Sequence, residues 1–546
     1  MKLLSGGYRP EPIIAFRVIK NRKTHSLSPP WAAPRIARSP DLPTLGNFGN
    51  TAVLSRYFPK LNAFSVLISS LALSACLSSR GIAPHAQPIA ADELATDQAI
   101  AAAVEEARWP RGQWWEAYAD PQLNQWVAFA TQGNPDLAMA TARVRQARAL
   151  GGVTEAAEAL QVNADTTLKR HHWPNDQFYG PGELSDTSTW DNNAAIGLSY
   201  SLDLWGRERN ASERSLDLAH MAVAEARQAQ LELQGNVVRV YIQLSLHYAQ
   251  RDILEAMLGQ QQQLLDLARE RLRGGIGTQF EVSQAETPLP ETHRQLDSLD
   301  EDIALTGNQL AALAGKGPGF AAGLRRPSLR LAAELPLPSK LPAALLGQRP
   351  DVVASRWRVA AQARGIKVAQ AGFYPNVDLS ASLGTLATGG GLLAFAAASK
   401  LGYSVGPAVS LPIFDGGRLR GQLGAASAAY DLAVAQYDQT LVTALKSISD
   451  QLIRRQSLAR QAQLAGESVT SARHTYDIAT VAYRRGLTDY LNVLNAQSLL
   501  FRQQQVEQQV QAARLGTSAA LITALGGGLG VAADSPPAER LAAPVR

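Results

Sequence analysis

The sequence predicts a mixed α and β membrane protein whose chain contains two copies of one structural unit. The chain is also expected to assemble with further copies of itself. Motifs recur in the same order at a nearly constant offset. Asn134-Pro-Asp-Leu137 returns as Arg349-Pro-Asp-Val352, and Gly275-Ile276 returns as Gly486-Leu487. Each copy also holds two segments of alternating apolar and polar residues, followed by a long helical pattern without proline. Ordered repetition of this kind indicates an internal duplication.

The basic charge of the chain is confined to its beginning. The 546 residues have a formal net charge of +5, which by itself suggests an anionic partner such as nucleic acid. However, the first 60 residues hold ten Lys or Arg and two acids, and residues 61–75 hold no charge. From Cys76 onward 42 basic residues stand against 45 acidic ones, so no nucleic-acid partner is expected.

A secretory leader is predicted over residues 1–75. Arg56 and Lys60 precede an apolar run over 61–73, and small residues follow it. This order is typical of a signal peptide. Residues 1–55 are rich in Pro, Arg and Ser without periodicity. We interpret them as a translation start assigned too early, with the true start near Val53 or Leu54.

Leu73-Ser74-Ala75-Cys76 resembles the lipobox of bacterial lipoproteins. That resemblance implies that Cys76 is lipidated and becomes the first mature residue, and Leu77 in place of Asp implies sorting to the outer membrane. The alternative is a buried cysteine on a short helix. Cys76 is the single cysteine of the chain, so an intramolecular disulfide and a cysteine-cluster zinc site are both excluded.

The mature chain divides into five predicted segments. We expect an N-terminal periplasmic segment over 76–133, a first repeat over 134–316, and a proline-rich linker over 317–348. A second repeat over 349–530 and a C-terminal tail over 531–546 complete the chain.

Four strands are predicted, two in each repeat. Apolar residues alternate with polar or small ones over 162–169, 195–204, 377–384 and 405–413. This is the period of a strand with one apolar face and also of a strand in a membrane barrel. Four strands cannot close a barrel. They therefore form a small open sheet, or strands from several chains together form one barrel.

Two long helices follow the strand pairs. Residues 207–273 and 418–485 lack proline, and each run would form about 100 Å of helix. Apolar residues at heptad-like spacing suit packed helices: Val237, Tyr241, Leu244, Tyr248, Leu441, Leu445, Ile448 and Leu452. Return helices are predicted near 280–314 and 490–525, and Thr287-Pro288 should bend or break only the first.

These elements indicate a subunit of a tubular oligomer, because such long, narrowly apolar helices need neighbours from other chains. No apolar run reaches the ~18 residues expected of a membrane-spanning helix, which argues against a polytopic helical transporter.

The chain resembles the outer-membrane efflux proteins, the TolC-like channel-tunnels, and within them the NodT-type lipoprotein branch. The resemblance covers Cys76 to Gly530. Besides the lipobox and the two repeated Pro-Asp motifs, it rests on these marks: Trp114-Trp115, Asp120-Pro-Gln-Leu123, Asp203-Leu-Trp-Gly-Arg207, Tyr374-Pro375 and Phe414-Asp-Gly-Gly-Arg418. Within the branch, the sequence is similar to fusaric-acid and aromatic-acid resistance components.

The resemblance implies a homotrimeric channel-tunnel. Three chains with four strands each would close a twelve-stranded barrel in outer-membrane lipid, and their helices would form a periplasmic α-helical barrel. The implied partners are a periplasmic adaptor (membrane fusion) protein and an inner-membrane pump.

The candidate functional residues lie at the helix-returning turns. The resemblance implies that Gly275 and Gly486 contact the adaptor, although ordinary helix capping explains these glycines equally well. It also places Leu491, Asn492 and Asn495 at the pore constriction, where several relatives carry Asp at the two polar positions. We hypothesise that amides make the closed end less cation-selective and suit anionic substrates. The alternative is a merely solvated polar face.

The sequence gives no sign of enzymatic chemistry, and we expect no cofactor and no metal. His171-His172 lies in a predicted surface loop without a third ligand at suitable spacing. Gly315-Lys316-Gly317 lacks the remainder of a phosphate loop. The glutamine run 260–263 is interpreted as a solvated helix face.

We therefore expect a passive outer-membrane duct for multidrug or organic-acid efflux, driven by a partner in the inner membrane. Two other classes remain open: a periplasmic lipoprotein scaffold or adaptor without a pore, and the outer-membrane duct of a protein secretion system.

Overall fold

The computed structural model describes residues 79–89, 112–174, 186–330, 349–388 and 391–528. The leader, Cys76 and the tail 531–546 lie outside these ranges. Within them, one series of elements occurs twice. The first is α3 (Pro135–Ala156), β1 (Gln161–Trp173), β2 (Thr187–Leu202) and α4 (Arg207–Arg273), then the return helices α5 (Gln279–Glu286) and α6 (Pro288–Leu313). The second is α8 (Pro350–Ala371), β3 (Asn376–Thr388), β4 (Leu401–Ser410), α9 (Arg418–Arg484) and α10 (Tyr490–Ala524).

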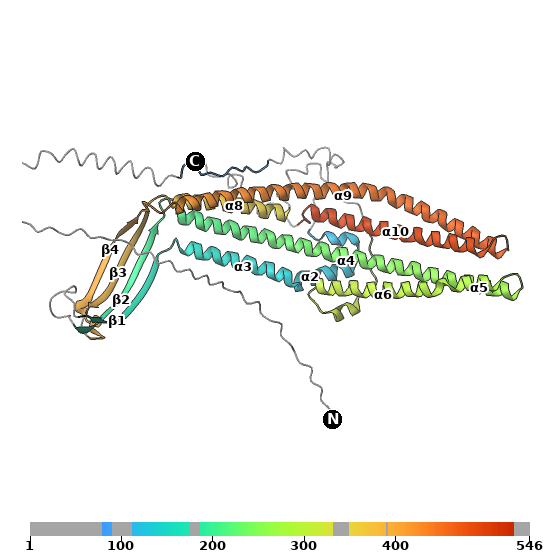
Figure 1. Ribbon diagram of the computed structural model, residues 1–546, viewed down its shortest axis with the longest axis horizontal. Helices are drawn as coiled ribbons and strands as arrows, with labels where there is room; N and C mark the ends of the chain where they lie inside the picture. Colours follow the sequence, from blue (N-terminus) through green and yellow to red (C-terminus); the bar gives the residue numbers. More distant parts are fainter. Residues whose placement is uncertain (1–78, 90–111, 175–185, 331–348, 389–390, 529–546) are drawn as a thin grey trace, which may run out of the picture. The chain divides into compact units, whose positions relative to one another are not determined.

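The long helices lie side by side (Figure 1). The helix α4 packs against α3, α6, α8 and α10, and α9 packs against α8 and α10. With 67 residues each, α4 and α9 are about 100 Å long. Their predicted apolar seams are confirmed, since Val237, Tyr241, Leu244, Leu441 and Ile448 are all buried.

The predicted interruption of the first return helix is also confirmed. One helix ends at Glu286 and the next begins at Pro288, because proline has no N–H to donate and its ring crowds the preceding turn. The second return helix runs unbroken over 35 residues.

An N-terminal aromatic group covers the middle of α4. It comes from a short 3-10 helix (Trp114–Tyr118) and from α2 (Pro121–Gly133). Asp120 caps α2 and is buried, and its carboxylate accepts hydrogen bonds from the Tyr241 hydroxyl at 3.0 Å and the Ser328 amide at 2.7 Å. These bonds tie α2 and the chain after α6 to α4. None of α2, α3 and α8 was predicted from the sequence.

The four strands form one antiparallel sheet in the order β1-β2-β3-β4. The predicted strand positions are confirmed, but the predicted bounds are wrong. Strands β1 and β3 each run four residues past their predicted ends, and β2 and β4 begin eight and four residues before their predicted starts. Strands β2 and β4 also end early. Strand β2 stops at Leu202, before Leu204. Strand β4 stops at Ser410, because Pro412 has no N–H with which to continue the ladder.

The register places apolar residues opposite one another across the whole sheet. Ala164 faces Ile196, Ile196 faces Leu383, and Leu383 faces Tyr403. The next row holds Asn163, Gly197, Ser382 and Ser404. The part of the chain that the structure describes leaves this apolar row open, since Ile196 and Leu383 are each 53% exposed and Tyr403 is 83% exposed. A sheet with an uncovered apolar face and a polar opposite face suits lipid on one side and water on the other.

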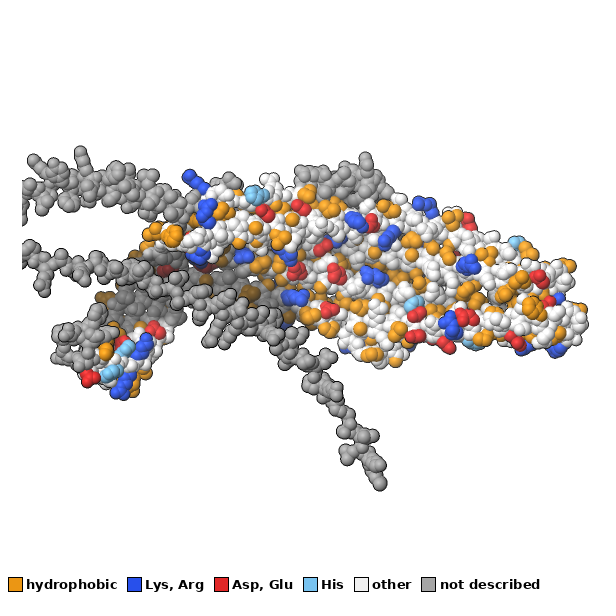
Figure 2. Space-filling view, in the orientation of Figure 1, with side chains coloured by type: hydrophobic (Ala, Val, Ile, Leu, Met, Phe, Trp, Pro, Cys, Tyr) orange, Lys and Arg blue, Asp and Glu red, His pale blue; other side chains and the backbone are white. Residues whose placement is uncertain are grey.

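None of the helices in the described ranges is long and apolar enough to cross a membrane. On the face shown in Figure 2, Lys and Arg side chains are interspersed with Asp and Glu along the helices.

Candidate functional site at the helix-returning turns

Both long helices end in the same turn. The Ile276 amide donates to the Arg271 carbonyl at 3.0 Å, and the Leu487 amide donates to the Ala482 carbonyl at 2.9 Å. The residue before each donor is glycine in the left-handed region, with φ of +74° at Gly275 and +73° at Gly486. Glycine ends a helix this way without the steric cost of a Cβ. Both predicted turn glycines therefore have a structural reason to be glycine.

The turns present apolar side chains to the surroundings. Ile276 is 71% exposed and Leu487 is 76% exposed, and the two occupy equivalent positions in the repeats. Phe280 is exposed beside the first turn. The end of each hairpin thus exposes apolar side chains beside exposed arginines.

Side-chain caps fix the helices that leave the turns. At the first turn, Thr278 and Glu281 form a capping box, in which each side chain accepts from the other residue's amide. At the second turn, the Asp489 carboxylate accepts from the Asn492 amide at 3.1 Å. These caps satisfy amides that have no partner within the helix.

Arg271 joins the first hairpin to the second. Its guanidinium carbon lies 4.7 Å from the centroid of the Tyr483 ring, and its Nη1 donates to the Tyr483 carbonyl at 3.1 Å. Its Nε lies 3.9 Å from a carboxylate oxygen of Glu281. This contact was not predicted from the sequence. The available signal was a difference between the repeats, because Tyr483 and Tyr490 stand where the first repeat has Leu272 and Gln279.

Tyr490 lies in the same buried cluster. Its ring meets that of Tyr483 edge-on at 5.8 Å, and its hydroxyl has no hydrogen-bond partner among the residues that the structure describes. Burial, with smaller contributions from the charges of Tyr483 and Tyr476, raises the pKa of Tyr490 to about 12. The phenol therefore stays neutral through the physiological range.

Leu491, Asn492 and Asn495 lie on one exposed face in the first turns of α10, while the neighbouring Val493 and Ala496 are buried. The Asn492 amide nitrogen donates to the Thr488 hydroxyl at 2.8 Å. Leu491, Asn492 and Asn495 are available to meet other copies.

The interpretation of residues 260–263 as a solvated face is wrong for half of the run. Gln261 is buried and accepts from the Thr292 hydroxyl of α6 at 2.9 Å. The side chain of Gln260 accepts from that of Gln497 of α10 at 3.3 Å. These glutamines hold the return helices against α4.

The predicted loop position of His171 and His172 is also wrong. Both lie in β1, opposite Thr189 and Ser188 of β2. The strand extends past the apolar alternation because ladder hydrogen bonds do not require apolar side chains. The histidines lie near Asp191 and Asp186, at 3.6 and 3.9 Å, and the described residues contain no group of three metal-binding side chains.

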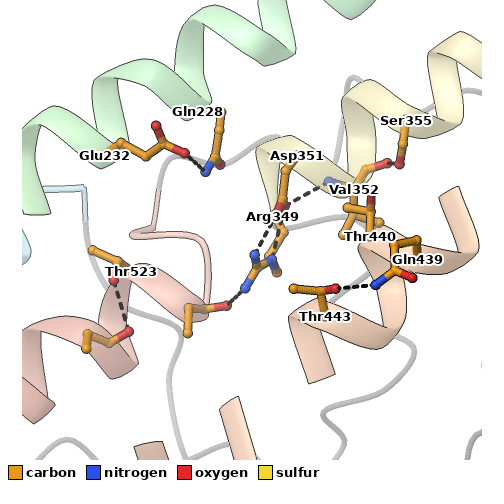
Figure 3. Close-up of polar contacts among 12 residues, drawn as sticks. Gln228, Glu232, Arg349, Asp351, Val352, Ser355, Gln439, Thr440, Thr443 and Thr523 are labelled. Atoms are coloured by element: carbon orange, nitrogen blue, oxygen red, sulfur yellow. Dashed lines mark hydrogen bonds and ion pairs between the residues drawn. The ribbon is translucent and has the colours of Figure 1, made fainter. Parts of the chain in front are cut away.

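The residue that begins each repeated Pro-Asp motif joins the start of its repeat to the end of the last helix of that repeat. Arg349 binds Asp351 through two nitrogens and donates from Nη1 to the Ala524 carbonyl at 2.6 Å, at the end of α10 (Figure 3). In the first repeat, the Asn134 side chain donates to the Leu313 carbonyl at the end of α6, at 2.9 Å. The same joint is therefore made by different side chains.

A family model described as "Outer membrane efflux protein" matches residues 126–316 and 341–527. The chain belongs to this family. Channels of the family form trimers and work with adaptor and inner-membrane pump components. The family consists of transport channels rather than enzymes. This family member is the outer-membrane component of an efflux system, and it extends into the periplasm.

Individual relatives agree with the family assignment. The fusaric acid resistance protein FusA of Burkholderia cepacia is 51% identical over 366 residues, which span 67% of this chain and 69% of that protein. The multidrug resistance outer membrane protein MdtP of Shigella flexneri is 28% identical over 87% of this chain and 98% of its own. The solved outer membrane protein VceC of Vibrio cholerae matches 77% of this chain and all of its own at a TM-score of 0.72 and 33% identity.

Proposed function

We propose that three copies of this efflux protein close a twelve-stranded barrel and export small organic acids of the fusaric-acid type, passively, from the periplasm to the exterior. The observation that carries the pore is the sheet. One face is apolar and not covered by the described residues, the other is polar, and β1 and β4 are the edge strands. Pairing between copies would satisfy both edges, as a hydrocarbon environment requires.

The substrate class rests on two observations. The similarity to FusA is the highest among the relatives described above. The constriction residues Asn492 and Asn495 carry no charge, so a threefold ring of them would not repel an organic anion as a carboxylate ring would.

The partners follow from the family and from the turns. The apolar turn residues around Gly275 and Gly486 would contact a periplasmic adaptor, and an inner-membrane pump would supply the energy. Cys76 would carry the lipid that anchors the chain. The five segment boundaries given by the sequence remain part of this proposal.

The test combines export with conductance. A strain lacking this gene should become sensitive to fusaric acid, and the wild-type gene should restore resistance. The purified protein should migrate as a heat-modifiable trimer and conduct in a planar bilayer. Conductance without restored resistance would refute the substrate class alone, whereas a protein without conductance would refute the pore.

A further inference from the structure

A cavity of about 760 Å³ lies where the sheet meets the helices. It is bounded by the segment Ser79–Ile82, by the start of α4 and by the end of α8. Strand β2 leads into α4 through Trp205, and α8 leads into β3 through Tyr374. The cavity therefore occupies the level at which the chain passes from helices to strands.

Two aromatic side chains mark this level. The rings of Trp205 and Tyr374 stack at 4.6 Å with planes 19° apart. The Trp205 indole donates to the Pro375 carbonyl at 2.8 Å. Each ring is about half exposed. Trp and Tyr concentrate where lipid headgroups meet water, because one part of each ring system is apolar and another part is polar.

The chain enters the cavity directly after the proposed lipid anchor. Arg80 lies four residues after Cys76, so their Cα atoms are at most about 14 Å apart. Beyond the cavity, Asp431 of α9 accepts from the amides of His85 and Ala86, both at 2.9 Å. The Ile89 amide donates to Asp438, one heptad further along α9, at 3.0 Å. Residues 85–89 are thus fixed on α9. Because Cys76 is the proposed lipid anchor, the chain just before Arg80 would lie at the lipid surface.

The charges that line the cavity are all positive. Arg80 and Lys367 contribute to its wall, and no Asp or Glu does. Lys367 is half-buried and has no hydrogen-bond or ion-pair partner among the residues that the structure describes. By contrast Arg364, three residues earlier in α8, forms an ion pair with Glu213. A lysine left without a counter-ion beside an arginine is suited to a phosphate group.

We propose that this cavity binds the phosphate headgroup of an anionic phospholipid in the leaflet that holds the Cys76 anchor. Arg80 and Lys367 would contact the phosphate, and the Trp205–Tyr374 pair would lie beside the upper acyl chains. The inference rests on the proposed lipidation of Cys76, because the acyl chains place the segment on the lipid-facing side of the channel.

The test is native mass spectrometry of the full-length protein equilibrated with equal amounts of phosphatidylglycerol and phosphatidylcholine. The wild type should retain phosphatidylglycerol preferentially. The double variant R80Q/K367Q should lower that preference by roughly tenfold, since two basic groups near the lipid are lost. The matched control R170Q/K400Q removes two cations at the opposite end of the sheet and should keep it. The variant R80K/K367R retains both charges and should also keep it.

Equal retention by the wild type and R80Q/K367Q would overturn the site, as would equal loss in both double glutamine variants. Displacement of phosphatidylglycerol by excess inorganic phosphate alone would show a free-phosphate site instead and refute the lipid. The same spectra report the mass of the N-terminal peptide. An acylated Cys76 without lipid preference refutes only the cavity, whereas an unmodified Cys76 refutes the anchor.

Discussion

Arg349 donates a 2.6 Å hydrogen bond to the carbonyl of Ala524. This bond joins the residue that precedes α8 to the last residue of α10. Asn134 holds Leu313 in the first repeat in the same way. The two accepting residues, Leu313 and Ala524, are 211 positions apart in the sequence. Each bond joins the beginning and the end of a repeat whose long helix is about 100 Å in length.

Replacing Arg349 should loosen the second repeat. The R349A variant loses the bond to Ala524 and leaves Asp351 without its cation, so it should destabilise the protein by about 2 kcal/mol. The R349K variant keeps the charge but cannot form the two-nitrogen contact, and it should recover part of the loss. Thermal unfolding of the purified protein, followed by circular dichroism, measures both. An unchanged R349A midpoint would show that the joint contributes nothing.

The turn glycines should resist substitution for backbone reasons alone. A Cβ at position 486 would meet no atom within 4 Å, but a left-handed φ costs an L-residue about 1–2 kcal/mol. We therefore expect G486A to lower stability by that amount. The control is G259A, which is equally unobstructed but lies inside α4, where alanine should stabilise the helix by about 0.5–1 kcal/mol. Equal effects of both changes would contradict this reasoning.

Tyr490 should make the protein sensitive to alkali. Its pKa is raised from 10.0 to about 12, so above pH 10 the unfolded chain loses this proton before the folded chain does. The neutral phenol stabilises the fold fully below pH 10, and this contribution is lost as the pH rises towards 12, at about 1.4 kcal/mol per pH unit. The Y490F variant should have a shallower fall over that window. The expectation fails if both proteins lose stability in parallel.

The absence of charge at Asn492 and Asn495 should determine the ion selectivity of the pore. In a trimer, N492D/N495D would introduce six carboxylates on the exposed face of α10 and should shift the permeability ratio toward cations. Reversal potentials in a salt gradient across a planar bilayer measure this ratio. The control N492A/N495A removes the amides without adding charge and should leave the ratio near that of the wild type. An unchanged ratio in the aspartate variant would place these residues away from the constriction.

The periodic features could be predicted from the sequence. The long helix α4 was predicted with both ends correct, because the proline-free run and the Gly274-Gly275 pair define them locally. The strands were predicted where apolar residues alternate. The start of β2, from Thr187 to Asn193, was missed because its only apolar residue is Trp190, so it shows no alternation.

Contacts between distant segments could not be predicted in the same way. The Arg271–Tyr483 contact depends on how two hairpins lie against each other, which no local pattern specifies. Asp120 could be recognised as a helix cap before Pro121, but its bond to Tyr241 spans 121 residues. Similarly, Gln261 is buried only because α6 brings Thr292 against it.

The break between Glu286 and Pro288 has a mechanical consequence. The missing hydrogen bond makes the first hairpin more compliant in bending than the second, whose return helix is continuous. In a ring of identical chains, compliant and stiff hairpins would alternate. Each chain would contribute one compliant hairpin and one stiff hairpin to the periplasmic end. When that end is pulled open, the compliant hairpins would therefore bend first, once per chain.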